Sequence, residues 1–195
     1  ETVARRDADG QWRLYGRKWF SSAVVGEAAL ALARPEGAGV GPGALALFYV
    51  ETMDDGQRKP ELVIDRLKDK LGTHELPTAE IHLEGLPAWP VGELEHGVRQ
   101  VAPMLNVTRS WNAICAVASM SRALQLARDY ARRRQAFGRT LAEQPLHAQT
   151  LAGMQAEFEA AFALSFEVAH LLGRTEQHAA TPQEAALLRL LTPLA

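Results

Sequence analysis

The fold class is decided by residues 97–133, which read GVRQVAPMLNVTRSWNAICAVASMSRALQLARDYARR. Apolar residues recur in this stretch at helical spacing, at Val98, Val101, Leu105, Trp111, Cys115 and Ala118. After Gly97 the stretch contains no glycine and a single proline, Pro103. The pattern therefore predicts one long helix, with Pro103 as the place where it can bend.

Helical patterning continues toward the C-terminus. A loop is predicted at Phe137–Thr140, and a second helix begins near Pro145, a residue type suited to a first helical turn, and ends at Gly173. Thr181–Glu184 predicts the start of a third helix, because it supplies a capping hydroxyl, a proline and a first-turn acid in that order. Two long antiparallel helices predict the start of an up-down helical bundle.

The sequence before residue 92 has the pattern of β structure. Asp7–Gly10 reads as a turn, and Trp12 and Leu14 alternate with polar neighbours in the strand that follows. Further short strands are predicted at Lys18–Ala23, Ala28–Ala33, Ala44–Val50, Leu62–Asp65 and Thr78–Leu83. The spacing favours an antiparallel barrel or sandwich over βαβ units. The predicted class is α+β multidomain, with a β domain over residues 1–96 and a helical bundle domain over residues 97–195.

Composition excludes several classes of function. The 21 basic and 23 acidic side chains give a formal charge of -2, which provides no electrostatic reason for nucleic acid or an anionic membrane as partner. The single Cys115 cannot form an internal disulfide, and no Cys/His pattern indicates a metal site, so a cytoplasmic location is expected. No apolar run approaches the ~18 residues that span a bilayer.

The two ends of the sequence lead us to expect an internal piece of a longer protein. The chain has no initiator methionine and opens on a predicted strand, and it stops just after a helical stretch. We therefore expect a β domain truncated at its N-terminus and a helical domain truncated at its C-terminus.

Three local patterns suggest functions that their context does not support. The glycine-rich loop 37–43 contains Pro42 and is followed by a β-like run instead of the helix that a dinucleotide loop must open, which favours a hairpin loop. His74-Glu75 begins like a zinc protease signature, but Thr78 stands where the second histidine ligand is required. Arg132–Arg134, at a helix end, is on composition alone a solvated face.

Three longer motifs, in this order, are specific. The first is Gly16-Arg-Lys-Trp-Phe-Ser-Ser-Ala23. The second is Leu67-Lys-Asp-Lys-Leu-Gly72, followed by the strand Thr78–Leu83 and Glu95-His96-Gly97. The third is Tyr130-Ala-Arg-Arg-Arg-Gln-Ala-Phe-Gly-Arg-Thr-Leu141. Together they resemble the acyl-CoA dehydrogenase family across nearly the whole chain. The AidB-like alkylation-response branch is the most similar, through Lys-Trp-Phe-x-Ser, Lys-Asp-Lys-Leu-Gly and Gln-Pro-Leu at residues 144–146.

The resemblance implies that the first motif contacts FAD. Trp19 matches the family tryptophan that packs at the isoalloxazine ring, where an aromatic face excludes water, and Phe20 follows it in the same motif. Ser21 matches the hydroxyl residue near the flavin N5. The alternative for Ser21 is a strand-end serine that bonds only to backbone or water.

The third motif implies a FAD site shared between subunits of a homo-oligomer. Arg134 and Phe137 match the family pattern Arg-x-x-Phe-Gly, in which the arginine reaches the FAD pyrophosphate of a neighbouring subunit. The alternative for Phe137 is a core aromatic that ends the helix. Pro145 stands where many members have the glutamine that holds the adenine, so Gln144 is the candidate replacement. Arg109 matches an arginine near the acyl-CoA thioester.

No catalytic residue is identified within this chain. The family chemistry needs a glutamate that removes the substrate α-proton, and in one branch it directly precedes the arginine matching Arg109, where this chain has Thr108. After Gly72 the arginine and serine common in the family are replaced by Thr73–Leu76, which departs from ordinary CoA binding.

The resemblance implies an FAD-dependent acyl-CoA dehydrogenase that introduces an α,β double bond into an acyl-CoA and passes electrons to an electron-transfer acceptor. The alternative is an AidB-like flavin protein with little dehydrogenase activity that binds DNA through a basic region outside this chain. A third reading is a helical interaction module without a cofactor.

Overall fold

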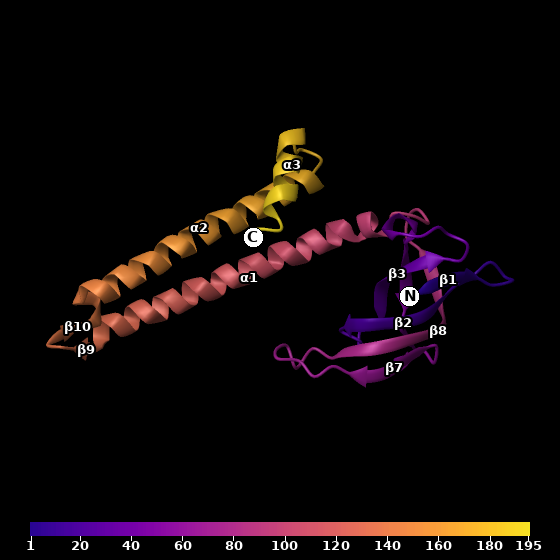
Figure 1. The fold of residues 1–195 in the computed structure, drawn as a ribbon, viewed down its shortest axis with the longest axis horizontal. Helices are drawn as coiled ribbons and strands as arrows, with labels where there is room; N and C mark the ends of the chain where they lie inside the picture. Colours follow the sequence, from indigo (N-terminus) through magenta and orange to yellow (C-terminus); the bar gives the residue numbers. More distant parts are fainter. The chain divides into compact units, whose positions relative to one another are not determined.

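The structure is a computed structural model that describes all of residues 1–195, and it forms two compact units, Glu1–Ala102 and Pro103–Ala195 (Figure 1). The first unit contains all strands up to residue 90 and the start of the first long helix, and the second contains the remaining helices and a pair of two-residue strands within residues 135–140. This order confirms the predicted class, a β barrel followed by helices.

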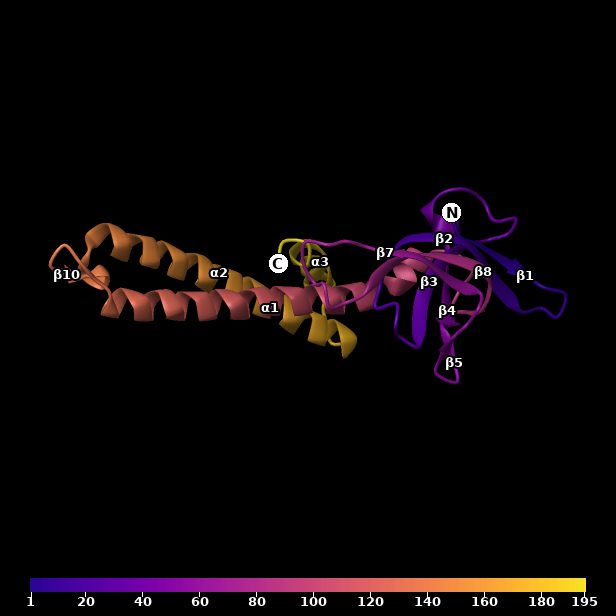
Figure 2. The ribbon, with the colours of Figure 1, turned by 90° about the horizontal axis from the view of Figure 1, so that it is seen from below.

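The main strands of the first unit form a closed ring. They are β1 (Val3–Arg6), β2 (Trp12–Ser22), β3 (Ala28–Pro35), β4 (Ala46–Glu51), β7 (Leu62–Leu67) and β8 (Thr78–Pro90). The order is β2-β1-β3-β4-β8, and β8 pairs back with β2 and so closes the ring, while β7 adds to β8 (Figure 2). Every pair is antiparallel except β1 with β3. A small hairpin, β5 (Met53–Asp54) with β6 (Gln57–Arg58), extends from one end.

The barrel core is built by alternation along these strands. Leu14, Phe48 and Leu86 are fully buried, and the half-buried Trp12 ring packs on Phe48 with centroids 5.7 Å apart. Inward residues of neighbouring strands therefore fill the interior, as expected for a small closed barrel. The core explains why Trp12 and Leu14, two residues apart, both read as apolar positions of one strand.

The glycine-rich segment joins the antiparallel strands β3 and β4, so the predicted hairpin loop is confirmed. Its only helix is η1 (Pro42–Ala44), one turn of 3-10 helix. The guanidinium of Arg34 donates to the carbonyls of Gly39 (2.6 Å) and Gly41 (3.2 Å). The loop is thus held by a side chain of the strand that precedes it.

The helices follow in the predicted order. They are α1 (Gly97–Arg133), α2 (Pro145–Glu176) and α3 (Pro182–Leu191), with the short pair β9 (Gln135–Ala136) and β10 (Arg139–Thr140) and the 3-10 turn η2 (Leu141–Glu143) between α1 and α2. In Figures 1 and 2, α2 runs back alongside α1. α1 is unbroken through Pro103. No helix is both long and apolar enough to cross a bilayer.

The start of α3 is capped as predicted. The Thr181 hydroxyl accepts from the Glu184 backbone N–H at 3.2 Å, and the Glu184 carboxylate accepts from the Thr181 N–H at 2.6 Å. This reciprocal box satisfies two backbone donors that the helix leaves unpaired. Leu188 then packs on Val168 and Leu171 of α2, forming the small core of the second unit.

Several strand ends differ from the prediction by one or two residues, and three differences are larger. The segment Lys18–Ala23, predicted as a separate strand, is the second half of β2, which is continuous from Trp12 to Ser22. β8 continues beyond Leu83 to Pro90, because it pairs first with β2 and β7 and finally with β4. α2 continues past Gly173 to Glu176, and the left-handed backbone after the helix occurs at His178 (φ 54), not at Gly173. A glycine inside a last turn is therefore not sufficient evidence for a helix end.

We predict that Gly97→Ala destabilises the barrel by about 1 to 3 kcal/mol, the usual cost of overpacking. A Cβ at Gly97 would lie 2.6 Å from the Ala46 carbonyl carbon and 2.7 Å from the Leu47 nitrogen, and backbone cannot yield as a flexible side chain can. The check is urea unfolding followed by circular dichroism. The matched control is Gly153→Ala, inside α2, where a Cβ meets nothing within 4 Å. Equal stability of the two variants would contradict the close approach.

Candidate functional site

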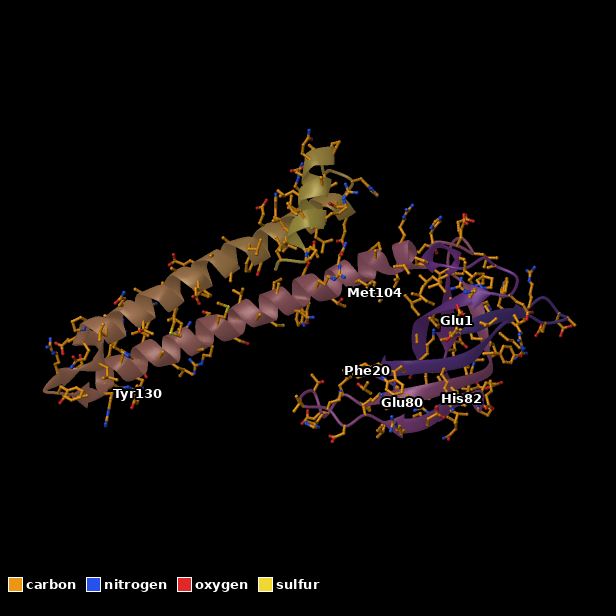
Figure 3. All side chains as sticks on the ribbon, viewed as in Figure 1. Glu1, Phe20, Glu80, His82, Met104 and Tyr130 are labelled. Atoms are coloured by element: carbon orange, nitrogen blue, oxygen red, sulfur yellow. The ribbon has the colours of Figure 1, made fainter.

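An irregularity in β2 places Trp19 and Phe20 on the surface. Lys18 pairs with Ile81 and Ser21 pairs with Ala79, so two residues of β2 face the single residue Glu80 of β8. Such a β-bulge re-aims side chains that strict alternation would send to opposite faces. Trp19 is 68% exposed and Phe20 is 60% exposed. Figure 3 places Phe20 and Glu80 close together on these two strands.

Two cations lie over the Trp19 ring. The Lys68 Nζ is 3.4 Å from the ring centroid, and the Arg66 guanidinium carbon is 5.8 Å from it. Both cations bond the same oxygen of Glu80, Oε1, with Lys68 Nζ at 2.6 Å and Arg66 Nε at 2.7 Å. The aromatic ring, two cations and a carboxylate therefore form one cluster, which we call the Trp19 cluster: Trp19, Arg66, Lys68 and Glu80.

The Trp19 cluster is electrostatically coupled. Hydrogen bonds from Arg66 and then Lys68 lower the pKa of the Glu80 carboxyl below its ordinary value, and the bond to Glu80 raises the pKa of Arg66. The Lys68 and Glu80 side chains are each only 14% exposed, whereas Arg66 is 65% exposed. Lys68 is thus held in place by its carboxylate, and Arg66 covers the pair from the solvent side.

Lys18, next to Trp19, is partly buried on the other side of β2. Its Nζ donates to the Leu32 carbonyl of β3 at 2.5 Å, although β2 and β3 are not neighbours in the sheet. Burial lowers the pKa of Lys18 to about 8, because the charged form loses water. Lys18 therefore links β2 to β3 with an ammonium that can deprotonate in mild alkali.

Ser21 is partly buried, and its hydroxyl forms no hydrogen bond within the chain. The neighbouring Ser22 instead bonds Thr78, with the two hydroxyl oxygens 2.9 Å apart. The structure thus brings Trp19, Phe20 and Ser21 together at the end of one strand and leaves the Ser21 hydroxyl available to a ligand.

The loop between β7 and β8 is organised by Lys70. Its ammonium donates to the carbonyls of Thr73 (2.8 Å) and Leu76 (2.7 Å) and to the Thr78 hydroxyl (3.0 Å). Residues Thr73–Leu76, which replace the arginine and serine common in the family that the motifs resemble, therefore lie in a loop that the Lys70 ammonium holds together. In this chain the Lys-Asp-Lys-Leu-Gly motif has a structural role that its position alone did not reveal.

The remaining predicted FAD contacts gather at the hairpin between α1 and α2. Arg134, just after α1, is exposed and forms no ion pair. Phe137 is 97% exposed with a left-handed backbone (φ 54), so it is not a core residue of this chain. Gln144 Nε2 donates to the Ala136 carbonyl at 2.9 Å and so ties the hairpin to the start of α2. The hairpin thus offers the Phe137 ring and two exposed arginines, Arg134 and Arg139, that form no ion pair in the chain.

Arg109 lies on the exposed surface of α1 and forms no ion pair. At ~1.5 Å per residue, it is roughly 37 Å along the chain's helical axis from Arg134, so α1 keeps the two arginines apart. Thr108 bonds the Leu105 carbonyl at 2.9 Å. Between Glu95 and Asp129 the chain has no carboxylate, so α1 provides no proton acceptor beside Arg109.

Sequence reasoning missed the three charged members of the Trp19 cluster. Arg66 lies on β7 and Lys68 directly follows its last residue, Leu67, so the two stand two apart in extended chain, a spacing that favours one face, and Glu80 is the third residue of β8. That spacing was a usable signal. The bulge in β2 and a second register shift, in β7 between Ile64 and Arg66, align these residues with Trp19 and leave no mark in the sequence, because a bulge is a property of pairing.

Comparison with known proteins gives consistent matches. Residues 95–195 match the family described as acyl-CoA dehydrogenase, C-terminal domain. Acyl-CoA dehydrogenase family member 11 of Caenorhabditis elegans is 42% identical over the whole chain, and the putative acyl-CoA dehydrogenase AidB of Escherichia coli K12 is 36% identical over the whole chain. The chain spans 32% and 34% of these relatives, about a third of their length.

A solved structure extends the match to the fold. The Caenorhabditis elegans acyl-CoA dehydrogenase ACDH-11, described in complex with C11-CoA, superposes with a TM-score of 0.90 at 41% identity. The match covers 99% of this chain and 33% of that one. The barrel and the helices described above are therefore shared with a relative in both sequence and arrangement.

We predict that the stability of the barrel rises between pH 8 and 10.5 because of Lys18. Its folded pKa, about 8, lies below the ordinary value of 10.5, so in this window the unfolded chain binds more protons and raising the pH favours the folded state. The measurement is the melting temperature of the protein and of Lys18→Met across this range. As the pH rises, the melting temperature of the unmodified protein should increase relative to that of Lys18→Met. A difference in melting temperature that stays constant with pH would contradict the burial of Lys18.

Proposed function

Because the chain belongs to the acyl-CoA dehydrogenase family, we propose that the full-length protein binds FAD and introduces an α,β double bond into an acyl-CoA thioester. The two whole-chain relatives are both described as acyl-CoA dehydrogenases, and the ACDH-11 structure is described with an acyl-CoA bound. This chain spans about a third of those proteins, so the activity is proposed for the full-length protein.

The observation that carries the proposal is the surface placement of Trp19 beside the unbonded hydroxyl of Ser21. An indole that is 68% exposed presents a large apolar surface that a ligand can cover. A flat, partly apolar ring system with hydrogen-bonding edges matches both groups, since the indole can stack and the hydroxyl can donate to or accept from the ring edge. The flavin ring has this chemistry.

We assign the remaining contacts by their chemistry. Arg134 is the donor to the FAD pyrophosphate, because a guanidinium is permanently charged and forked. Phe137 excludes water from the same region, and Gln144 holds the hairpin while its amide oxygen stays available for the adenine. In keeping with the family, this hairpin serves the FAD of a neighbouring subunit of a homo-oligomer, and the protein acts in the cytoplasm with a separate electron acceptor.

The chain's own residues bind and orient the reactants. Bound FAD would supply the hydride acceptor for the substrate β-hydrogen. Trp19 and Phe20 keep water away from the ring, Ser21 holds its edge, and Arg109 orients the thioester carbonyl by charge. The α-proton requires a carboxylate, and α1 offers none between Glu95 and Asp129, so we propose that this base lies outside the chain.

The second candidate is an AidB-like flavin protein that binds DNA and has little dehydrogenase activity. The whole-chain identity of 36% to AidB of Escherichia coli favours its consideration. The formal charge of -2 gives no electrostatic reason for this chain to bind DNA, so we assign such binding to a basic region elsewhere in the protein.

We predict that the purified full-length protein shows flavin absorption bands, and that these bleach on anaerobic addition of an acyl-CoA mixture. Bleaching reports transfer of reducing equivalents from substrate to flavin and supports the dehydrogenase. Bands that are present and do not respond favour the AidB-like protein. A colourless protein that does not take up added FAD would rule out both.

We predict that Arg134→Ala in the full-length protein weakens FAD binding by about 1.5 to 3 kcal/mol, the contribution of a charge-assisted hydrogen bond. The matched control is Arg132→Ala, which removes an exposed positive charge from the end of the same helix. Titration of the apoprotein with FAD measures both. If the two variants lose affinity equally, the effect comes from general charge and the assignment of Arg134 is wrong.

A further inference from the structure

The Trp19 ring is covered on one side by a fixed cation. Lys68 Nζ lies 3.4 Å from the ring centroid, a distance at which the ammonium touches the ring face. Trp19 is nevertheless 68% exposed. Because Lys68 covers one face and the side chain is still largely exposed, the other face of the indole is open to solvent. We call this open face the platform, and the Lys68 ammonium behind it the backing.

The backing is rigid because two strands are irregular at the same place. β2 has two residues, Trp19 and Phe20, opposite Glu80. β7 has an extra residue, Asp65, between the partners of Ile81 and Glu80. Both neighbours of β8 therefore shift register at Glu80, and the shifts bring Trp19 and Arg66 onto the side of the sheet that carries this carboxylate.

The carboxylate fixes the cation. Glu80 Oε1 accepts hydrogen bonds from both Lys68 and Arg66, and the Lys68 and Glu80 side chains are each 14% exposed. A free lysine loses rotamer entropy when it is held over a ring, whereas this lysine is already ordered by its ion pair. The Lys68 ammonium thus restrains the position of the indole, and Glu80 of β8 restrains the position of the ammonium.

A second cation–aromatic pair in the barrel provides a comparison. The Arg5 guanidinium lies 5.2 Å from the Tyr15 ring centroid and bonds Glu36, but its side chain is 54% exposed and that of Glu36 is 62% exposed. That pair is a solvated surface contact. The Trp19 cluster differs from it in burial and in the closeness of the cation, so it is more than a surface ion pair that happens to lie near a ring.

We propose that Lys68 is a positioning residue for Trp19: held by Glu80 and Arg66, it fixes the indole so that the open face receives a flat ring ligand, the flavin. The identity of the ligand rests on the proposed function above, whereas the positioning rests on the contacts of the Trp19 cluster. Lys68 itself touches the indole and acts on the ligand only through it.

The test uses the full-length protein and three variants. Lys68→Met keeps the length of the side chain and removes its charge, Lys68→Arg keeps the charge, and Glu36→Gln is the matched control that disrupts the solvated cation–aromatic pair. For each, the FAD dissociation constant is measured by titrating the apoprotein, together with the visible absorption spectrum of the bound flavin and the melting temperature of the apoprotein.

We expect Lys68→Met to raise the FAD dissociation constant about tenfold, as for a cation–π contact in a partly desolvated site. Its flavin absorption band should also shift, because the indole no longer holds one position against the ring. Lys68→Arg should restore both, since a guanidinium can bond Glu80 and cover the indole. Glu36→Gln should match the unmodified protein.

Three results would overturn the positioning role while leaving the proposed function intact: unchanged FAD binding in Lys68→Met, an equal loss in Glu36→Gln, or failure of Lys68→Arg to restore the spectrum. A loss of affinity that follows the melting temperature, with the spectrum unchanged, would reduce Lys68 to a residue of barrel stability and also overturn it. A full-length protein that holds no FAD would overturn the proposed function, and the ligand of the platform with it.

Discussion

The pairing of β2 with β8 is the constraint on which the first unit depends. It closes the ring of strands, and its register determines which residues of β2 face the core and which face solvent. Between Trp12 and Lys18 the register shifts once, where Gly85 of β8 has no partner between those of Leu14 and Tyr15, and Leu14 is fully buried. Beyond Lys18 the bulge opposite Glu80 breaks the alternation. A regular strand would send Trp19 and Phe20 to opposite faces, whereas the bulge exposes both.

Lys18 and Trp19 show what this local geometry does to adjacent residues. The lysine, the more polar of the two, reaches the Leu32 carbonyl and is partly buried, while the tryptophan is exposed under a second lysine. This arrangement reverses the usual distribution of apolar and charged side chains. Such a reversal is unfavourable for folding alone, since it desolvates an ammonium and exposes an indole, and under the proposed function the flavin is the group that covers the indole.

Much of the fold could be predicted from the sequence because its signals are local. The helical spacing from Val98 to Ala118, the cap at Thr181 and the strand around Leu14 each depend on a few neighbouring residues. The continuation of β8 to Pro90 could not be predicted, because it depends on pairing with β4. The same holds for the Trp19 cluster: the motif identified Trp19 as a candidate, but Glu80 and Lys68 join it only through the register of three strands.

The two groups of proposed FAD contacts differ in how much ordering a ligand would demand. Trp19 is already restrained by Lys68 and Glu80, so stacking on it immobilises little that is free. Arg134 and Phe137 are exposed and without partners, so binding would have to order both side chains at a cost of about 0.5 to 1.5 kcal/mol for each rotamer-rich one. Gln144 reduces that cost for the backbone by tying the hairpin to α2, and leaves only the side chains free. The ring end of the proposed ligand would thus meet a preorganised surface, while its charged end would meet groups that become ordered on contact.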